Sequence, residues 1–196
     1  SALQSRWTDA SVLPSQAIDD GDIRTRVVEE VDAFRRFFGR SPEVVVPPTF
    51  VWNERVERAW AEQGVKVLVT PGERYEMRGA DGLPVDTGCV YRNGQRCRSG
   101  LVAMVRDDYY EPVRGHEAGR GVAALAAKWS QRRPVLFETH RSNFLGTTAR
   151  LDLSLRAIGG LVEAALRGQP GLRFMSVAEL ARQYADGADL LDRRLQ

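Results

Sequence analysis

The chain has few of the residues, and none of the long apolar runs, on which several classes of protein depend. It contains only two cysteines and two histidines in 196 residues, and no cysteine spacing suggests a Cys-ligated metal. No apolar run approaches the length of a membrane span, so we expect no membrane partner. Lys66 and Lys128 are the only lysines, and the formal net charge is +2. Because the arginines are scattered among Asp and Glu, we expect no nucleic-acid partner.

Several catalytic and targeting motifs are also missing. There is no Gly-x-Ser-x-Gly elbow and no Walker loop, so neither signature assigns a reaction. Residues 119–124 imitate a dinucleotide-binding fingerprint, but no apolar strand precedes them. The chain begins Ser1-Ala2-Leu3 without a signal peptide or an initiator Met. We interpret it as a processed product or a piece of something longer, of unknown localisation.

The composition is that of an ordinary globular protein. Hydrophobic residues make up 43% of the chain and charged residues 28%, and the length is sufficient for a real core. We therefore expect one domain over residues 1–196.

Helical and strand patterns alternate along the chain, which predicts an α/β fold with a mostly parallel sheet. Gly39 is the expected C-cap of the first helix, and Ser176 with Glu179 forms a capping box at the start of a later one. Residues 73–118 are otherwise irregular, apart from one hairpin and one strand. The expected helices are 22–38, 53–64, 122–132, 147–168, one from 176 and a last short one at 189–195; the expected strands are 43–46, 65–69, 101–106, 134–138 and 172–175.

The two cysteines flank a hairpin signal. Asn93-Gly94 is typical of a two-residue turn, which pairs Val90 with Cys97. That register places the sulfurs of Cys89 and Cys97 on opposite faces, and a disulfide would need a different loop. Whether the two are bonded stays open.

Polar residues follow the predicted parallel strands. Because the carboxyl ends of parallel strands share one edge, these residues should meet at the catalytic face of a (β/α) barrel. The expected strands are too few to close one, so the fold class is a partial (β/α) barrel with an inserted hairpin. The residues are Thr49, Trp52 and Asn53 after the first strand, Thr70 after the second, His140, Arg141 and Asn143 after a third, and Ser176 after a fourth.

Three segments resemble a divergent group of polysaccharide deacetylases, a carbohydrate esterase family. Residues 46–53 (Val-Pro-Pro-Thr-Phe-Val-Trp-Asn) are similar to its third motif region, and residues 87–95 followed by 105–112 resemble its middle part. The best match is Thr-His-Arg-Ser-Asn-Phe at residues 139–144, in the place of the last motif histidine. The resemblance covers roughly residues 16–185. The Asp-Asp pair and His-x-x-x-His of the family, which supply the base and the metal ligands, are missing; Asp19-Asp20 is interpreted as a solvated helix cap.

The resemblance implies roles for individual residues. His140 would stabilise or protonate the leaving group or oxyanion, against a structural role in its loop. Arg141 and Asn143 could bind sugar hydroxyls or brace the same loop. Trp52 could stack on a sugar or fill the core, and Asn53 is most simply a helix N-cap. Glu111 and Asp107 could be acid or base groups of the site or lie on the surface. His116 is expected in a flexible loop.

We therefore expect a carbohydrate-active hydrolase of the deacetylase type, performing metal-assisted hydrolysis of an acetyl amide or ester. The chain would be incomplete, lacking the amino-terminal metal-binding part of the barrel. The alternative is a non-enzymatic carbohydrate-binding or structural remnant of the same fold. No metal or cofactor is expected in this chain alone, although the resemblance implies a zinc-like divalent ion for a complete member. Besides a carbohydrate substrate, the expected partners are an upstream fragment or a second copy at the exposed strand edges, or residues 7–18 folded back.

Overall fold

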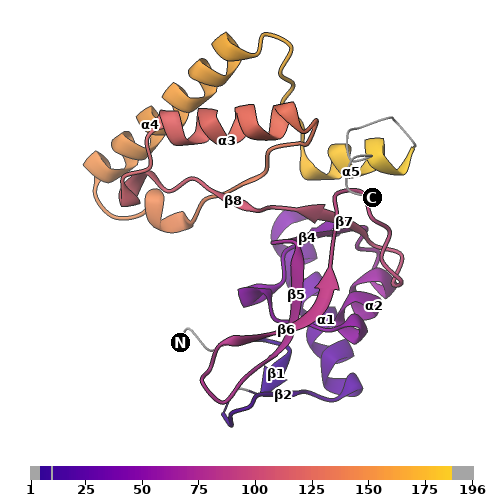
Figure 1. Ribbon diagram of the computed structural model, residues 1–196. Coiled ribbons are helices and arrows are strands. Elements are labelled where there is room, and N and C mark those ends of the chain that lie inside the picture. The colour runs from indigo at the N-terminus through magenta and orange to yellow at the C-terminus, as the bar shows by residue number, and fades with distance from the viewer. Residues whose placement is uncertain (1–4, 10, 187–196) are drawn as a thin grey trace. The chain divides into compact units, whose positions relative to one another are not determined.

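The computed structural model describes residues 5–9 and 11–186, and these divide into two units. The first unit holds the described residues up to Val105 together with Ser176–Asp186, and the second holds Arg106–Met175. The sequence had suggested one domain over residues 1–196. The mixed α/β character is confirmed in both units (Figure 1).

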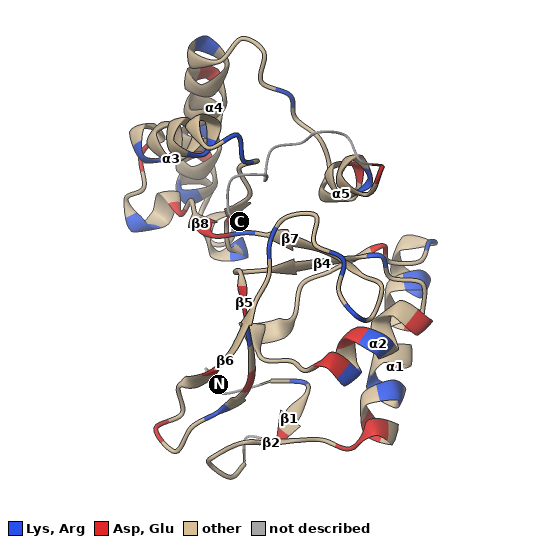
Figure 2. Cartoon of the chain, turned by 45° about the vertical axis from the view of Figure 1, so that its right-hand side comes forward, with Lys and Arg blue, Asp and Glu red and all other residues tan. Residues whose placement is uncertain are grey.

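A small parallel sheet forms the centre of the first unit. Its strands are β3 (Val44–Val45), β4 (Val67–Thr70) and β7 (Val102–Val105), in the order β3-β4-β7. Every residue of β4 and β7 is buried, as expected for strands that are covered on both faces. These strands carry no charge, whereas Lys, Arg, Asp and Glu gather on the helices α1 and α2 (Figure 2).

The predicted ends of the helices of this unit lie within two residues of the observed ones, and the predicted caps are present. In α1 (Asp20–Phe38), the Asp19 side chain accepts from the Asp22 N–H at 2.9 Å, and Gly39 ends the helix at φ 68°. Asn53 caps α2 (Glu54–Glu62) in the same way. The capping box of Ser176 is present at the start of α5 (Val177–Ala185). These predictions are confirmed because caps depend on side chains three residues apart.

Two antiparallel pairs flank the sheet, and both were missed. Strand β5 (Glu73–Arg78) pairs with β6 (Pro84–Val90), so residues 73–90 are not irregular as predicted. The turn between them closes through a hydrogen bond from Gly82 N–H to the Gly79 carbonyl at 2.9 Å. Strand β1 (Thr8–Asp9) pairs with β2 (Gln16–Ala17).

The predicted hairpin has its turn but not its register. Cys97 N–H donates to Leu101 at 2.8 Å, so this segment pairs with the chain that follows it rather than with Val90. The cause is the buried Asn93, whose side-chain oxygen accepts from the Val105 N–H at 2.6 Å and holds the turn against β7. Both cysteines are free.

The amino-terminal segment folds back onto the core of the first unit. Trp7 is fully buried and meets Trp60 edge to face, with ring centroids 5.4 Å apart. Its carbonyl accepts from Ile18 N–H at 3.3 Å. Trp52, Leu68 and other side chains complete the same hydrophobic cluster.

The second unit is built on two helices. α3 (Ala118–Ser130) packs on α4 (Thr148–Gly168), and Gly121 allows the close approach because a Cβ there would lie 2.5 Å from the Leu161 side chain. Strands β8 (Asp108–Tyr109) and β9 (Phe137–Glu138) pair in parallel. Short 3-10 helices, η2 (Pro112–Arg114) and η3 (Arg141–Asn143), follow them; another, η1 (Pro48–Phe50), lies in the first unit.

Three expectations about the sheet need correction. The strand at residues 134–138 pairs with β8 and not with the sheet of the first unit. Residues 172–175 are not a strand; they are largely exposed, with Phe174 at 65%, so no buried face fixes an extended pairing. The predicted partial barrel of the deacetylase type is not confirmed, because the described strands form separate small sheets, none of which closes into a barrel. The helix expected at 189–195 lies outside the described residues.

No helix in the described part of the chain is long and apolar enough to cross a membrane.

Candidate functional sites

His140 stands directly after β9, where the sequence had placed it. Strand side chains alternate between faces, so Glu138 and His140 project from the same face of this segment. The His140 side chain is 52% exposed, whereas the Glu138 side chain is only 10% exposed. His140 is therefore the member of the pair that solvent and a ligand can reach.

Two carboxylates hold the His140 ring, one at each nitrogen. The Nδ1 atom lies 2.8 Å from Oε1 of Glu111, and Nε2 lies 3.1 Å from Oε1 of Glu138. The backbone N–H of His140 also donates to Glu111, at 2.9 Å. The contact of Nδ1 with Glu111 is a hydrogen bond, whereas the contact of Nε2 with Glu138 is an ion pair only when the ring carries two protons.

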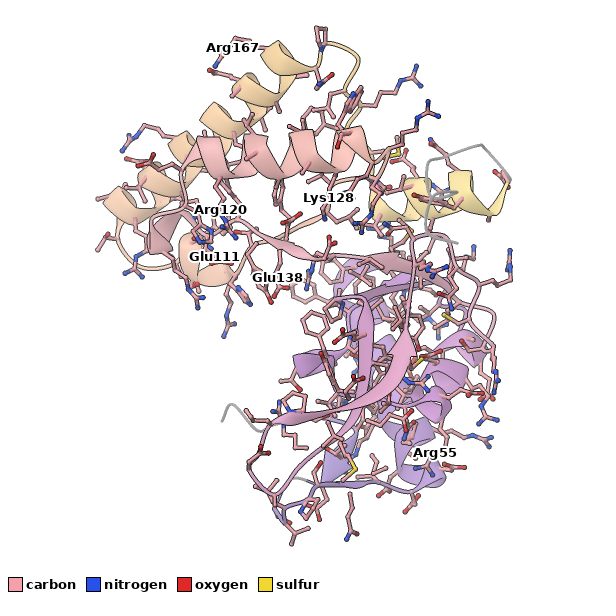
Figure 3. All side chains as sticks on the ribbon, viewed as in Figure 1. Arg55, Glu111, Arg120, Lys128, Glu138 and Arg167 are labelled. Atoms are coloured by element: carbon pink, nitrogen blue, oxygen red, sulfur yellow. The ribbon has the colours of Figure 1, made fainter. Side chains whose placement is uncertain are left out.

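Glu111 is the buried anchor of this cluster, with a side chain only 1% exposed. Its Oε2 accepts from the Asn143 amide at 2.6 Å. Burial acts to raise the pKa of Glu111, but the hydrogen bonds from Asn143 and His140 outweigh it and lower the pKa below its usual value. The carboxylate is thus the stable form. Glu111 and Glu138 are labelled in Figure 3.

Asn143 ties the cluster to the fold. It is fully buried, its side-chain oxygen accepts from Val113 N–H at 3.2 Å, and its carbonyl accepts from Ser154 of α4 at 2.6 Å. A buried amide with every hydrogen bond directed inward braces the loop rather than facing a sugar. On the other side of the ring, Glu138 pairs with Arg106 at 3.2 Å.

Of the remaining polar candidates in the second unit, two make contacts that hold the fold together and one is exposed. Nδ1 of His116 accepts from the backbone N–H of Glu111 at 3.0 Å, which fixes its loop. Asp107 pairs with Lys128 and with Arg133; burial acts to raise its pKa, but the two cations hold the pKa below its usual value. Arg141 is exposed on η3, next to His140.

In the first unit, Trp52 has no face open to a ligand. It is fully buried, and its indole N–H donates to Glu57 at 2.9 Å. Glu57, itself 1% exposed, also accepts from Tyr91 at 2.5 Å, from Arg74 at 3.2 Å and from Ser99 at 3.2 Å. Burial, followed by the hydrogen bond to Glu57, raises the pKa of Tyr91 far above its usual value.

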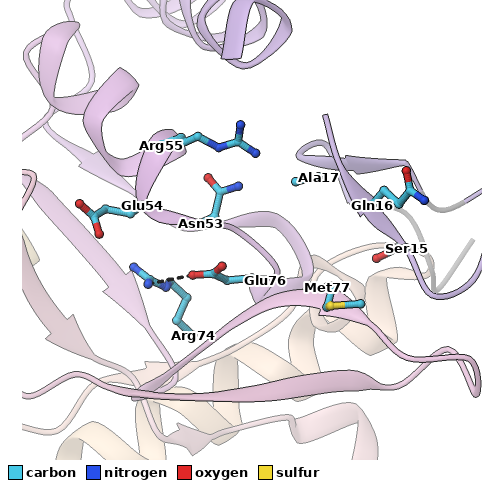
Figure 4. A pocket seen from close by; sticks show the side chains of 9 residues that line it. All are labelled: Ser15, Gln16, Ala17, Asn53, Glu54, Arg55, Arg74, Glu76 and Met77. Atoms are coloured by element: carbon cyan, nitrogen blue, oxygen red, sulfur yellow. Dashed lines mark ion pairs between the residues drawn. The ribbon is translucent and has the colours of Figure 1, made fainter. Parts of the chain in front are cut away.

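An open cleft of about 580 Å³ lies beside this network. Asn53, which caps α2, stands at its wall, and Arg74 and Glu76 of β5 form an ion pair of 2.8 Å across its floor (Figure 4). Arg55 forms an ion pair with Asp20, at 2.6 Å. The remaining lining residues are Ser15, Gln16, Ala17, Glu54 and Met77.

The structure thus brings together Glu111, His140 and Asn143 from the predicted set, and Trp52 and Asn53 lie in the first unit. Sequence reasoning missed Glu138 and Glu57. The signal for Glu138 was its spacing of two from His140 on a strand; the signal for Glu57 was a carboxylate beside Val56 and before Trp60, on the apolar face of a helix. Within residues 5–9 and 11–186, no three His, Cys, Asp or Glu side chains are arranged to hold a metal ion.

Comparison with known families places the chain among the carbohydrate-active hydrolases. The family model described as glycosyl hydrolase family 57 matches residues 9–110, which is just over half of the chain. The chain belongs to glycosyl hydrolase family 57. No curated protein and no solved structure matches it significantly.

This finding shows that the predicted membership of the polysaccharide deacetylases was wrong, because they are a different family. One of the three segments that carried the resemblance, residues 46–53, is a proline pair after a strand followed by a helix cap, and such a local arrangement is not specific to one family. The zinc-like ion that the deacetylase resemblance implied loses that support. The matched segment contains the cleft and the Glu57 network and ends one residue before Glu111.

Proposed function

We propose that the chain takes part in hydrolysis of a glycosidic bond and that His140 is its proton donor. The observation that carries this proposal is the exposed imidazole with a carboxylate at each ring nitrogen, in a chain of a carbohydrate-active hydrolase family. Glycosidic bond cleavage requires a proton for the leaving oxygen and a carboxylate for the opposing charge. His140 supplies the first and Glu138, the less buried of its two partners, supplies the second.

Glu111 has a different part in this proposal. It is too deeply buried to touch a substrate, so it positions the ring. Movement of Glu138 away from Nε2 would free that N–H for a substrate oxygen. Asn143 keeps Glu111 in place.

The test is release of reducing ends from a panel of soluble polysaccharides by the complete protein. His140→Ala should lower kcat by roughly 10²–10⁴-fold, the usual contribution of a positioned acid or base. Glu111→Gln should lower kcat more than it changes KM and should shift the pH profile. The control Arg167→Ala, at an exposed site of α4, should leave the rate unchanged. Full activity of His140→Ala would refute the assignment.

A second candidate is a carbohydrate-binding module without turnover, and the cleft beside Asn53 favours it. Hydrogen-bonding side chains line this cleft, and it lies in the segment that matches the family. In this case the protein would bind an oligosaccharide from the panel without cleaving it. Binding would weaken in Glu76→Gln and not in His140→Ala, which distinguishes the two functions.

A further inference from the structure

The apolar stripe of α1 continues beyond the core that it covers. Ile23, Val27 and Val31 are buried, and the same three- and four-residue spacing continues through Phe34 to Phe38. Yet Phe38 is 56% exposed and its neighbour Phe37 is 82% exposed. This face of the helix therefore presents aromatic rings to solvent, as an extension of a surface that elsewhere packs against protein.

The three phenylalanines contact one another and lie on a capped end of the helix. The ring centroids of Phe34 and Phe38 are 4.4 Å apart, and those of Phe37 and Phe38 are 4.8 Å apart. The helix ends in order, because the Gly39 N–H donates to the Arg35 carbonyl at 2.8 Å. An exposed aromatic cluster on a formed helix is preorganised for binding.

A basic groove of about 460 Å³ lies at this end of α1; Arg35 of the helix and Arg40, just after the helix, line it, and none of the three phenylalanines does. The cations Arg35, Arg40 and Lys66 line it together with one carboxylate, Glu43. Arg35 is paired with Asp32 at 3.3 Å and Lys66 with Glu43 at 3.7 Å. No carboxylate in the described part of the chain forms an ion pair with Arg40. The groove thus has more positive than negative charge.

We propose that this aromatic–basic surface binds an acidic polypeptide segment that carries apolar side chains. Apolar side chains would cover the phenylalanines, as protein covers the rest of the same stripe, and carboxylates would meet the unpaired guanidinium and the cations of the groove. A concave groove admits an extended chain, whereas a flat bilayer cannot enter it. The surface is defined by Phe34, Phe37, Phe38, Arg35, Arg40 and Lys66.

The proposal is tested by fluorescence anisotropy with a labelled peptide that alternates glutamate and leucine. This peptide should bind saturably to the full chain, and peptides alternating lysine with leucine or glutamate with serine should bind much more weakly. The double variant Phe37→Ser/Phe38→Ser should weaken binding by roughly tenfold or more. Arg40→Glu should also weaken it and reduce its dependence on salt.

Matched controls separate the surface from general effects. Leu83→Ser removes an equally exposed apolar residue of the first unit, 63% exposed, and Arg167→Glu reverses a cation of the second; both should bind like the original protein. Circular dichroism checks that the variants are folded. The proposal is overturned if the glutamate–leucine peptide does not bind, or if both phenylalanine substitutions leave its affinity unchanged. It is equally overturned if these phenylalanines instead mediate binding to phosphatidylserine vesicles or dimerisation measured by sedimentation.

Discussion

Replacement of Glu57 by alanine should be among the most destabilising single changes in the first unit. The carboxylate accepts hydrogen bonds from Trp52, Tyr91, Arg74 and Ser99. The Arg74 side chain is only 14% exposed, so the substitution leaves a largely buried cation without one of its partners. Breaking a buried pair in this way costs about 3–5 kcal/mol.

Two features of the site set where the value falls in that range. Glu76 remains as a second partner of Arg74, at 2.8 Å, which limits the loss. The buried indole and phenol donors lose their acceptor, and each such group costs about 1–3 kcal/mol unless water replaces it. We therefore expect a loss of about 4 kcal/mol for Glu57→Ala. Glu57→Gln keeps one acceptor oxygen and should lose only about 1–2 kcal/mol.

The assay is urea unfolding followed by tryptophan fluorescence, which reports mainly on the first unit because Trp7, Trp52 and Trp60 are all buried there and only Trp129 lies in the second unit. The urea concentration at the midpoint should be lowest for Glu57→Ala, intermediate for Glu57→Gln and highest for the original protein, with unchanged m-values. Glu54→Ala on the same helix is the control, since its side chain has no part in this network; it should change stability by no more than about 1 kcal/mol. A loss below about 1 kcal/mol for Glu57→Ala would refute the reasoning.

Three further results are expected, each from a different part of the chain. Because the folded pKa of Glu111 is lowered, its contribution to stability is present above the unfolded pKa of about 4.3 and is lost as the pH falls through the folded pKa. In an acid titration, the unfolding midpoint of Glu111→Gln should therefore fall less steeply with pH than that of the original protein. Gly121→Ala places a methyl group against Leu161 and should destabilise the second unit by about 1–3 kcal/mol, measured by thermal unfolding, whereas Gly119→Ala, with open space around it, should be neutral or stabilising. Burial raises the pKa of Cys97 to about 12, so this thiol should react with a disulfide reagent only after unfolding; rapid labelling of the native protein would contradict that.

The sequence predicts those parts of the fold that depend on neighbours in the chain. The helix of Asp19 to Gly39, the cap at Asn53 and the box at Ser176 each need only side chains a few residues apart. The β5–β6 hairpin also had a local signal, the Asp-Gly pair at residues 81–82, but only the stronger Asn93-Gly94 signal was used; its turn is present, with a different pairing. Tertiary packing of Asn93 on β7 then decided the pairing.

The candidate site could be predicted only in part, for the same physical reason. His140 and Asn143 are three residues apart and were found together after one strand. Their carboxylate partner, Glu111, lies 29 positions before His140, and only the fold brings the two into contact. Trp52 shows the opposite case: its place after a strand was predicted, but burial depends on the whole core. The division into two units had no signal in composition.

The degree of burial along the His140 cluster supports the role that is proposed for each member. Glu111, with 1% of its side chain exposed, can act only through the ring that it holds; Glu138, with 10%, becomes available if the ring moves; His140, with 52%, is open to solvent already. The proposed proton donor must be the accessible member, and a buried carboxylate holds the ring in position more strongly than an exposed one. The order of exposure therefore matches the order that acid catalysis requires. A surface histidine with two mobile carboxylate neighbours would not have this gradient, because surface pairs are screened and exchange freely with water.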